Sequence, residues 1–172
     1  MRRIRYAVAA SLDGYIAGPN GEYDWIIMDP AIDFDAIFAQ FDTLLMGRRT
    51  FAPMANSDQD DSFKGKEIVV VSRSLRQEGY PKVTIVNADA VKTASALKEK
   101  AGKDIWLFGG GLLFKSLAEA GLVDAVEVAV IPILLGGGVP LFPPPAPQVK
   151  LELKGQKTYP SGIVSLEYDV KN

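Results

Sequence analysis

The 172-residue sequence contains neither cysteine nor histidine. The absence of cysteine excludes disulfides and a cysteine nucleophile, and the absence of histidine excludes the Ser-His-Asp triad and the commonest zinc ligand, so we expect no metal site. Proton transfer must use carboxylates, tyrosines, lysines or water.

A net charge of −2 gives no general basic field, which argues against nucleic acid as a partner. No apolar run has the length of a membrane span and the N-terminal segment does not have the form of a signal peptide, so we expect no membrane partner and a cytoplasmic protein.

The residues that are present fit one α/β domain spanning residues 1–172. Hydrophobic residues make up 48% of the chain and charged residues 23%, as is typical of a packed globular protein. Apolar periodicity predicts strands at residues 4–10, 43–46, 66–71, 83–86, 105–108, 125–131, 150–154 and 164–170, and helices at 34–41, 91–101 and 112–120. The alternation of strands and helices predicts a mainly parallel sheet, and the last two strands are expected to form an antiparallel hairpin.

Three consecutive glycines, Gly109 to Gly111, follow one of these strands and precede a predicted helix. Backbone N–H groups at such a helix start can approach a phosphate, but a tight strand-to-helix turn explains the motif alone equally well. Phe114 occupies the third glycine position of the GxGxxG fingerprint, which disfavours a standard Rossmann domain. The lysine and serine or threonine of a P-loop phosphotransferase are also missing after the glycines.

Two further strand ends carry groups that suit an anion. The motif GRRTF at 47–51 places two arginines and a threonine in the first turn of a short predicted helix, where cations are unfavourable unless an anion lies between them. Ser72 and Arg73 follow the next predicted strand. A phosphorylated dinucleotide lying across the carboxyl edge of a sheet needs donors at several strand ends. Solvated charged side chains are the alternative explanation for these arginines.

Five motifs occur in order along the chain, namely SLDGYIAG at 11–18, GRRTF at 47–51, SRS at 72–74, GGGLLF at 109–114 and PILLGGGVPLF at 132–142. Together they resemble the dihydrofolate reductase superfamily, and within it the stand-alone relatives of the C-terminal reductase domain of the bifunctional riboflavin-biosynthesis deaminase-reductase. The resemblance implies a dihydrofolate-reductase-like three-layer α/β sandwich, with a mainly parallel central sheet and an antiparallel C-terminal hairpin. It also implies NADPH as the cofactor.

The resemblance further implies where the cofactor binds. The GRRTF motif would lie near the phosphates, Ser72 and Arg73 near the adenosine 2′-phosphate, and the glycine triplet at the pyrophosphate. Ala9 and Ile16 would line the nicotinamide pocket, although core packing is the alternative for these two residues and for Phe114. The complete set of implied cofactor-binding residues is Ala9, Ile16, Gly47, Arg48, Arg49, Thr50, Ser72, Arg73, Phe108, Gly109, Gly110, Gly111, Leu112 and Phe114.

The substrate side of the site matches neither enzyme closely. Dihydrofolate reductases use a carboxylate on the helix after the first loop, but Phe34 takes that position when the aromatic residues are aligned, and residues 126–131 lack the threonine of those enzymes. The paired aspartates and proline of the riboflavin-pathway reductase are missing from residues 52–61. The catalytic candidates are Asp13, as a loop-orienting residue or proton donor, and Asp33 and Asp35 on the helix. The alternative for Asp13 is an ordinary turn aspartate before Gly14. The substrate-binding candidates are Trp25, Phe34 and Phe38.

These observations predict an NADPH-dependent reductase of a small planar heterocycle, pyrimidine or pterin-like, such as a substrate of the 5-amino-6-(5-phosphoribosylamino)uracil type. The loop at 13–25 is expected to fold over the reacting rings. The alternatives are a non-catalytic nucleotide-binding module that keeps the cofactor cradle, and a true dihydrofolate reductase. We also expect a homodimer, because the proline-rich segment 134–147 presents four apolar side chains, those of Leu135, Val139, Leu141 and Phe142.

Overall fold

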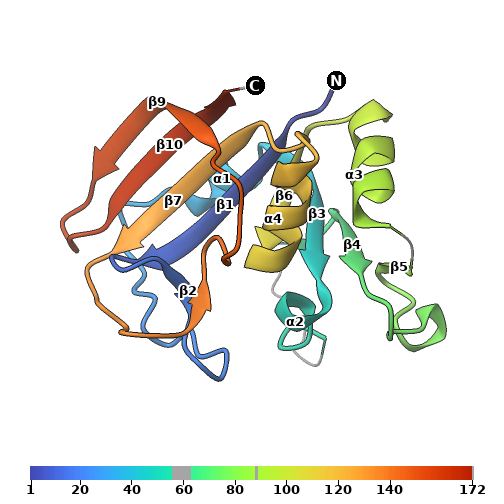
Figure 1. Ribbon diagram of the computed structural model, residues 1–172, viewed down its shortest axis with the longest axis horizontal. Helices are drawn as coiled ribbons and strands as arrows, with labels where there is room; N and C mark the ends of the chain where they lie inside the picture. Colours follow the sequence, from blue (N-terminus) through green and yellow to red (C-terminus); the bar gives the residue numbers. More distant parts are fainter. Residues whose placement is uncertain (56–62, 88, 172) are drawn as a thin grey trace.

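The computed structural model describes residues 1–55, 63–87 and 89–171 of the chain (Figure 1). Of the 52–61 segment, which lacks the paired aspartates and proline of the riboflavin-pathway reductase, residues 56–61 therefore lie outside the described residues. The strands are β1 (Ile4–Ser11), β2 (Tyr15–Ala17), β3 (Phe41–Gly47), β4 (Glu67–Val71), β5 (Thr84–Val86), β6 (Asp104–Gly109), β7 (Ala125–Ile131), β8 (Val139–Pro140), β9 (Lys150–Thr158) and β10 (Val164–Lys171). The helices are α1 (Phe34–Phe38), α2 (Arg48–Phe51), α3 (Ala90–Glu99) and α4 (Gly111–Glu119), with a short 3₁₀ helix η2 (Gln77–Gly79).

One eight-stranded sheet organises the molecule, in the order β5-β4-β3-β6-β1-β7-β10-β9. The first six strands of this order pair in parallel, and β10 pairs antiparallel with both β7 and β9. A separate two-stranded sheet joins β2 to β8. The expected parallel sheet with an antiparallel C-terminal hairpin is confirmed.

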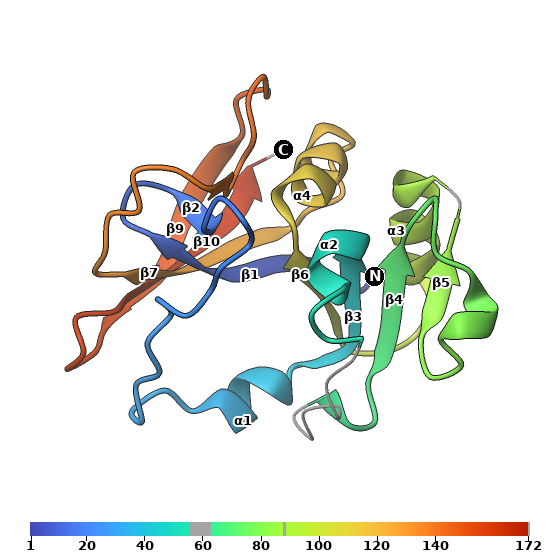
Figure 2. The same cartoon turned by 90° about the horizontal axis from the view of Figure 1, so that it is seen from below.

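Helices cover the two faces of the sheet unequally. Helices α3 and α4 pack on one face, where Ala94, Leu97, Phe114 and Leu117 join a core built on the central strands. Helix α1 lies on the opposite face (Figure 2), which carries a second core around β3 and β4. Strand β4 is buried on both faces, as its continuous run of β-branched residues requires. The three-layer arrangement is therefore the expected one.

The first helix is shorter than its sequence pattern predicts. Asp33 caps this helix, because the Asp33 side chain accepts a hydrogen bond from the Ala36 amide at 2.9 Å. The helix ends at Phe38, however, and Phe41 is not helical but begins β3 with only 1% of its surface exposed. The Lys66 ammonium group donates to the carbonyls of Phe38 at 2.7 Å and Phe41 at 2.8 Å. Lys66, which precedes β4, therefore binds one carbonyl at the end of α1 and one at the start of β3.

Candidate cofactor and substrate site

The three anion-suited motifs meet at one edge of the sheet because β3, β4 and β6 are neighbouring parallel strands. In the register of the sheet, Gly47 pairs with Val71, and Met46 pairs with Gly109. The Thr50 hydroxyl lies beside the glycines, since a Cβ added to Gly109 would be 3.3 Å from Thr50 Oγ1 and one added to Gly110 would be 3.5 Å away. The turn after β6 and the turn after β3 therefore form one surface.

The N-terminus of α4 begins at this surface. Gly110 is its N-cap and supplies no side-chain hydrogen bond, while the Gly110 carbonyl accepts the first helical bond from Phe114 at 3.1 Å. The third glycine, Gly111, is required by packing, because a Cβ at this position would lie 2.5 Å from the Pro140 carbonyl oxygen. Gly109 and Gly110 thus shape the surface beside Thr50, and Gly111 permits close packing of the 140–143 segment.

Three arginines around this edge have free side chains. Arg48, Arg49 and Arg73 are exposed, and their guanidinium groups make no hydrogen bond or ion pair within the described residues. Such unpaired guanidinium groups can bind phosphate oxygens with paired N–H donors.

Ser72 differs from the arginine that follows it. It is only 5% exposed, and its Oγ accepts hydrogen bonds from the amides of Ser74 at 3.2 Å and Leu75 at 3.0 Å. The Asn87 side-chain amide also donates to the Ser72 carbonyl. The Ser72 side chain therefore shapes the turn after β4 and leaves Arg73 at the surface.

Asp13 holds the first loop against the segment that leads to β8. Its carboxylate accepts hydrogen bonds from Ser11 Oγ at 2.6 Å, the Gly136 amide at 2.7 Å and the Leu135 amide at 3.1 Å. The Ser11 hydrogen bond, followed by those of the two amides, lowers the pKa of Asp13 below its usual value. A carboxylate held in its ionised form as an acceptor is a poor proton donor, so the geometry supports the loop-orienting role.

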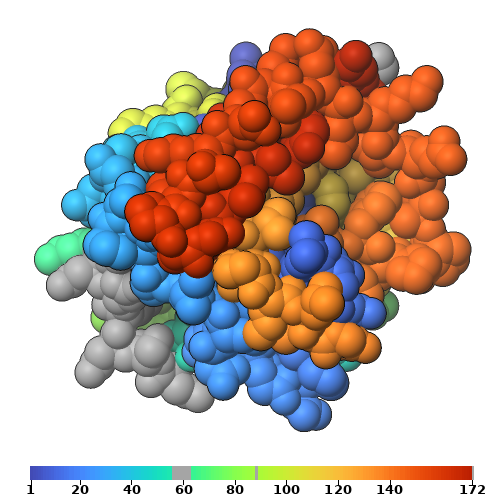
Figure 3. Space-filling model, turned by 90° about the vertical axis from the view of Figure 1, so that its left-hand side faces the viewer, coloured from blue at the N-terminus to red at the C-terminus, as the bar shows by residue number. Residues whose placement is uncertain are grey.

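A second, unexpected aspartate anchors the same loop at its far end. Asp29 is 3% exposed and accepts hydrogen bonds from the Ala31 amide at 2.8 Å and the Ser161 amide at 3.0 Å. Hydrogen bonding by Ser161 and Ala31 lowers the pKa of Asp29. Figure 3 shows the two contact regions, with the blue first loop beside the orange 131–140 segment and the red β9–β10 turn beside the light-blue segment before α1. The Asp-Pro dipeptide at 29–30 was a signal for a turn, but no sequence pattern reveals a partner in a distant hairpin.

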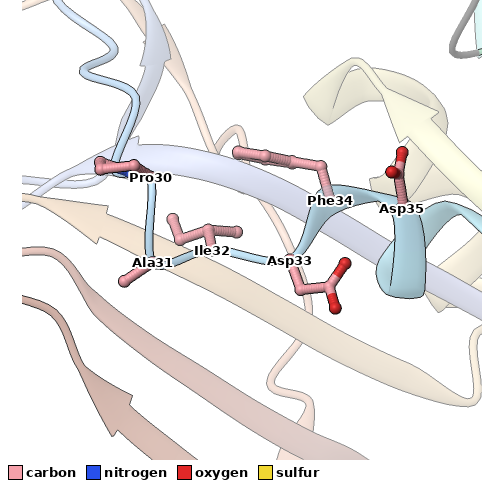
Figure 4. Close-up of a pocket in the computed structure, with 6 residues that line it drawn as sticks. All are labelled: Pro30, Ala31, Ile32, Asp33, Phe34 and Asp35. Atoms are coloured by element: carbon pink, nitrogen blue, oxygen red, sulfur yellow. The ribbon is translucent and has the colours of Figure 1, made fainter.

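The two aspartates of α1 do not converge. Asp33 and Asp35 are both exposed, and Asp33 is engaged in capping the helix. Residues 30–35 line an open surface hollow in which the two carboxylates point in different directions (Figure 4). The structure therefore does not bring them together as a catalytic pair.

Aromatic rings gather where α1 meets the sheet. The ring of Phe38 lies 5.3 Å from that of Trp106 and 5.9 Å from that of Phe34. Phe108 packs on Trp106 at 4.9 Å, so its ring belongs to this cluster. The half-buried Trp25 is held separately, through a hydrogen bond from its Nε1 to the Glu22 carbonyl at 3.0 Å.

The remaining expected cofactor residues divide between surface and core. Ala9 is half-buried on β1 and pairs with Ala129 of β7, and Ile16 is half-buried on β2. Leu112 is 65% exposed in the first turn of α4. Phe114 is 5% exposed, and its ring stacks on Tyr6 at 3.9 Å in the core beneath α4. For Phe114 the core alternative is the one that the geometry supports.

The model of the RibD C-terminal domain family matches residues 2–165. The chain belongs to this family. Family membership supports an oxidoreductase.

Relatives of this RibD C-terminal domain protein match nearly its whole length. The uncharacterized protein YyaP of Bacillus subtilis (strain 168) is 35% identical over 97% of this chain and 94% of its own. A crystal structure from Shewanella sp. PV-4, assigned to riboflavin biosynthesis, is 28% identical with a TM-score of 0.84 and covers 100% of both chains. Dihydrofolate reductase from Enterococcus faecalis, solved with NADP(H) and RAB-propyl, has a TM-score of 0.70 at 20% identity and covers 99% of this chain and 97% of its own. At that identity the likeness to dihydrofolate reductase shows the fold alone.

In the part of the chain that the structure describes, no group of three or more acidic residues is placed to hold a metal ion. No helix among the same residues is long and apolar enough to cross a membrane.

Proposed function

We propose that the protein is an NADPH-dependent reductase of a small planar heterocycle, pyrimidine or pterin-like. The observation that carries this proposal is the presence, at one edge of the sheet, of three arginines with unpaired side chains and the start of α4, where the N-cap Gly110 supplies no side-chain hydrogen bond. A dinucleotide with an additional phosphate matches this distribution of donors better than a single phosphate does.

The residues at this edge fit the cofactor. Gly109 and Gly110 place no side chain of their own beside Thr50, and Gly110 is half-buried, so a pyrophosphate would bind at Gly110 next to the first amides of α4. Arg48 and Arg49 would neutralise the phosphates, and Arg73 would bind the 2′-phosphate beside the turn that Ser72 shapes. When bound, NADPH supplies the hydride.

The heterocycle would lie beyond Ala9 and Ile16, on the sheet face that α1 covers. Phe34, Phe38 and Trp25 offer aromatic faces for a planar ring at that end of the sheet. Because Asp13 is committed to accepting hydrogen bonds, we propose that water delivers the proton that completes the reduction. A chain without histidine or cysteine suits a reaction in which NADPH supplies the hydride and water supplies the proton.

Cofactor titration of arginine variants tests the proposal. Arg73→Ala should weaken NADPH binding about 10- to 100-fold, because a charge-assisted hydrogen bond contributes roughly 1.5–3 kcal/mol, and it should leave NADH binding nearly unchanged. Quenching of tryptophan fluorescence measures both affinities. Lys82→Ala is the matched control, since Lys82 is an exposed cation that precedes β5 at the opposite edge of the parallel strands. Absence of saturable NADPH binding to the unmodified protein would refute the proposal.

A non-catalytic nucleotide-binding module is the second candidate, and the divergent aspartates of α1 favour it. Both candidates predict NADPH binding. Oxidation of NADPH that depends on an added pyrimidine or pterin compound, followed by absorbance, would rule the module out.

We also propose that the protein is a homodimer. The dimer surface differs from the one that the sequence predicted, because Leu141 and Phe142 pack against the core beneath α4 and are not exposed. Leu135 and Val139 are half-buried. The exposed apolar side chains of the region are instead Leu134, Leu151 and Leu153.

A further inference from the structure

The last strand in the order of the sheet, β9, has a long outer edge (Figure 1). Among the described residues, β10 is the one strand that pairs with it. Strand β9 is nine residues long and contains no proline, and all of its residues except Gly155 are exposed. Native proteins usually shorten, interrupt or cover such an edge, because its backbone N–H and C=O groups can pair with another chain. The outer edge of β9 therefore suits the addition of a further strand.

One face of β9 is apolar. Leu151 and Leu153 are 40% and 51% exposed on this face, and they pair with Val170 and Tyr168 of β10. Val170 packs against the core beneath α4, so this face continues the one that α3 and α4 cover. Both helices lie away from β9 (Figure 1), and the two leucines remain at the surface.

The opposite face of β9 carries charges of both signs. The Glu152 carboxylate lies 3.1 Å from Lys154 Nζ and 3.8 Å from Lys171 Nζ. Lys150 makes no ion pair within the part of the chain that the structure describes, and the register places it directly opposite Lys171. Like charges that face each other across two strands are unfavourable. A carboxylate on the outer side of Lys150 would offset this repulsion.

An antiparallel second copy of β9 supplies that carboxylate in one two-fold register. When Leu151 lies on the two-fold axis, Lys150 of each copy is opposite Glu152 of the other. The neighbouring two-fold registers oppose Lys150 to itself or to Lys154, and like charges then face each other. Charge complementarity thus selects the register that is centred on Leu151.

The apolar residues match in the same register. Leu151 meets its own copy, and Val149, just before the strand, lies opposite Leu153 of the other copy. The pairing of β9 with β10 is regular from Lys150 to Leu153, and its irregularity comes only after Leu153. The stretch that would pair with a second copy is therefore a regular strand.

Building on the proposed homodimer, we propose that the two copies join edge to edge through β9, antiparallel and centred on Leu151. The sheets of the two copies then form one continuous sheet. The cofactor edge at β3, β4 and β6 lies toward the other end of the strand order, so the interface leaves it clear. The third exposed leucine of the region, Leu134, lies outside this interface.

Single cysteines test the register, because the chain has no cysteine of its own. In the proposed register the two copies of residue 151 face each other with a Cα separation of about 4.5–5.5 Å, which a disulfide can bridge. Leu151→Cys should therefore give a disulfide-linked dimer on mild oxidation, seen on a non-reducing gel. Leu153→Cys is the matched control, because its two copies would be about 13 Å apart along the strands and should not link.

Charge exchange tests the same pairing without a covalent bond. Lys150→Glu opposes two carboxylates at both ends of the interface and should weaken the dimer roughly 10-fold, measured by sedimentation velocity over a concentration series. The double variant Lys150→Glu/Glu152→Lys restores opposite charges and should return the affinity to within about threefold of the unmodified protein. Lys157→Glu is the matched control, since Lys157 is an exposed lysine of the same strand beyond the paired stretch.

The outcomes separate the interface from the homodimer itself. If the unmodified protein is a monomer, both proposals fall. If it is a dimer that Lys150→Glu does not weaken, or if Leu153→Cys links while Leu151→Cys does not, the β9 interface is overturned and the homodimer stands. NADPH affinity should be the same in all of these variants, so the reductase proposal is tested independently.

Discussion

Replacement of Gly111 by alanine should destabilise the protein although alanine is the better helix former. The added Cβ would lie 2.5 Å from the Pro140 carbonyl oxygen, 2.9 Å from Pro143 Cδ and 3.1 Å from the Leu141 carbonyl oxygen. An unstrained carbon–oxygen contact is about 3.3 Å or longer, so backbone on one side or the other must move by nearly an ångström. Neither a carbonyl group nor a proline ring can rotate aside as a flexible side chain does.

The size of the effect follows from two opposing contributions. Overpacking of this kind costs about 1–3 kcal/mol, while alanine in place of glycine in a helix gains roughly 0.5–1 kcal/mol and less at the first helical position. The free energy of unfolding should therefore fall by about 2 kcal/mol. For a chain of this length the melting temperature should fall by roughly 4–8 °C.

Urea denaturation followed by circular dichroism measures this change, with Gly137→Ala as the matched control. A Cβ on Gly137 would have no atom within 4 Å, so that variant should stay within about 0.5 kcal/mol of the unmodified protein. Gly111→Ala should shift the midpoint to lower urea without changing the slope. If both variants unfold at the midpoint of the unmodified protein, the 140–143 segment does not pack rigidly on α4 and the reasoning is refuted.

Two further predictions concern the first loop and the assembly. The hydrogen bond from Ser11 lowers the pKa of Asp13, so the ionised Asp13 stabilises the fold above the usual aspartate pKa of about 4, and this stabilisation is lost as the pH falls through the lower pKa of the folded state. Below about pH 4, the free energy of unfolding of the unmodified protein should therefore decline more steeply than that of Asp13→Asn. Urea titrations at a series of pH values measure both. Light scattering coupled to size exclusion should give twice the chain mass of 18.6 kDa, and a mass equal to that of one chain would contradict the homodimer.

The sequence predicted the fold well where structure depends on local patterns. Alternation and β-branched runs located each strand of the eight-stranded sheet, because side chains on a strand repeat every two residues. The error at Phe41 has a physical cause: a helical period cannot show that a distant lysine will capture the carbonyls of Phe38 and Phe41. The same limit applies to Phe114, whose aromatic ring is equally compatible with a pocket and with the core that Tyr6 completes.

The proposed substrate side depends more on the tertiary structure than the proposed cofactor side does, for a related reason. The motifs proposed to bind the cofactor are contiguous, since each turn carries its own glycines or arginines directly after a strand. The groups that shape the other half are paired across the chain, as in Asp13 with Gly136, Asp29 with Ser161 and Arg5 with Glu127. Charged residues in central strands, such as Arg5 and Glu127, were a visible signal, but their pairing requires the register between β1 and β7.

By itself, the sequence determined the element types, the chemistry that is missing without histidine and cysteine, and the glycine and arginine turns that suit a phosphorylated dinucleotide. These are consequences of composition and local periodicity. Only the tertiary structure decided that Gly109 and Gly110 shape the surface beside Thr50 while Gly111 packs on Pro140, that Asp33 and Asp35 diverge, and that Arg5 pairs with Glu127. Those facts depend on which elements become neighbours and, within the sheet, in what register. A shift of one residue in β1 or β7, for example, would turn Arg5 or Glu127 to the other face of the sheet.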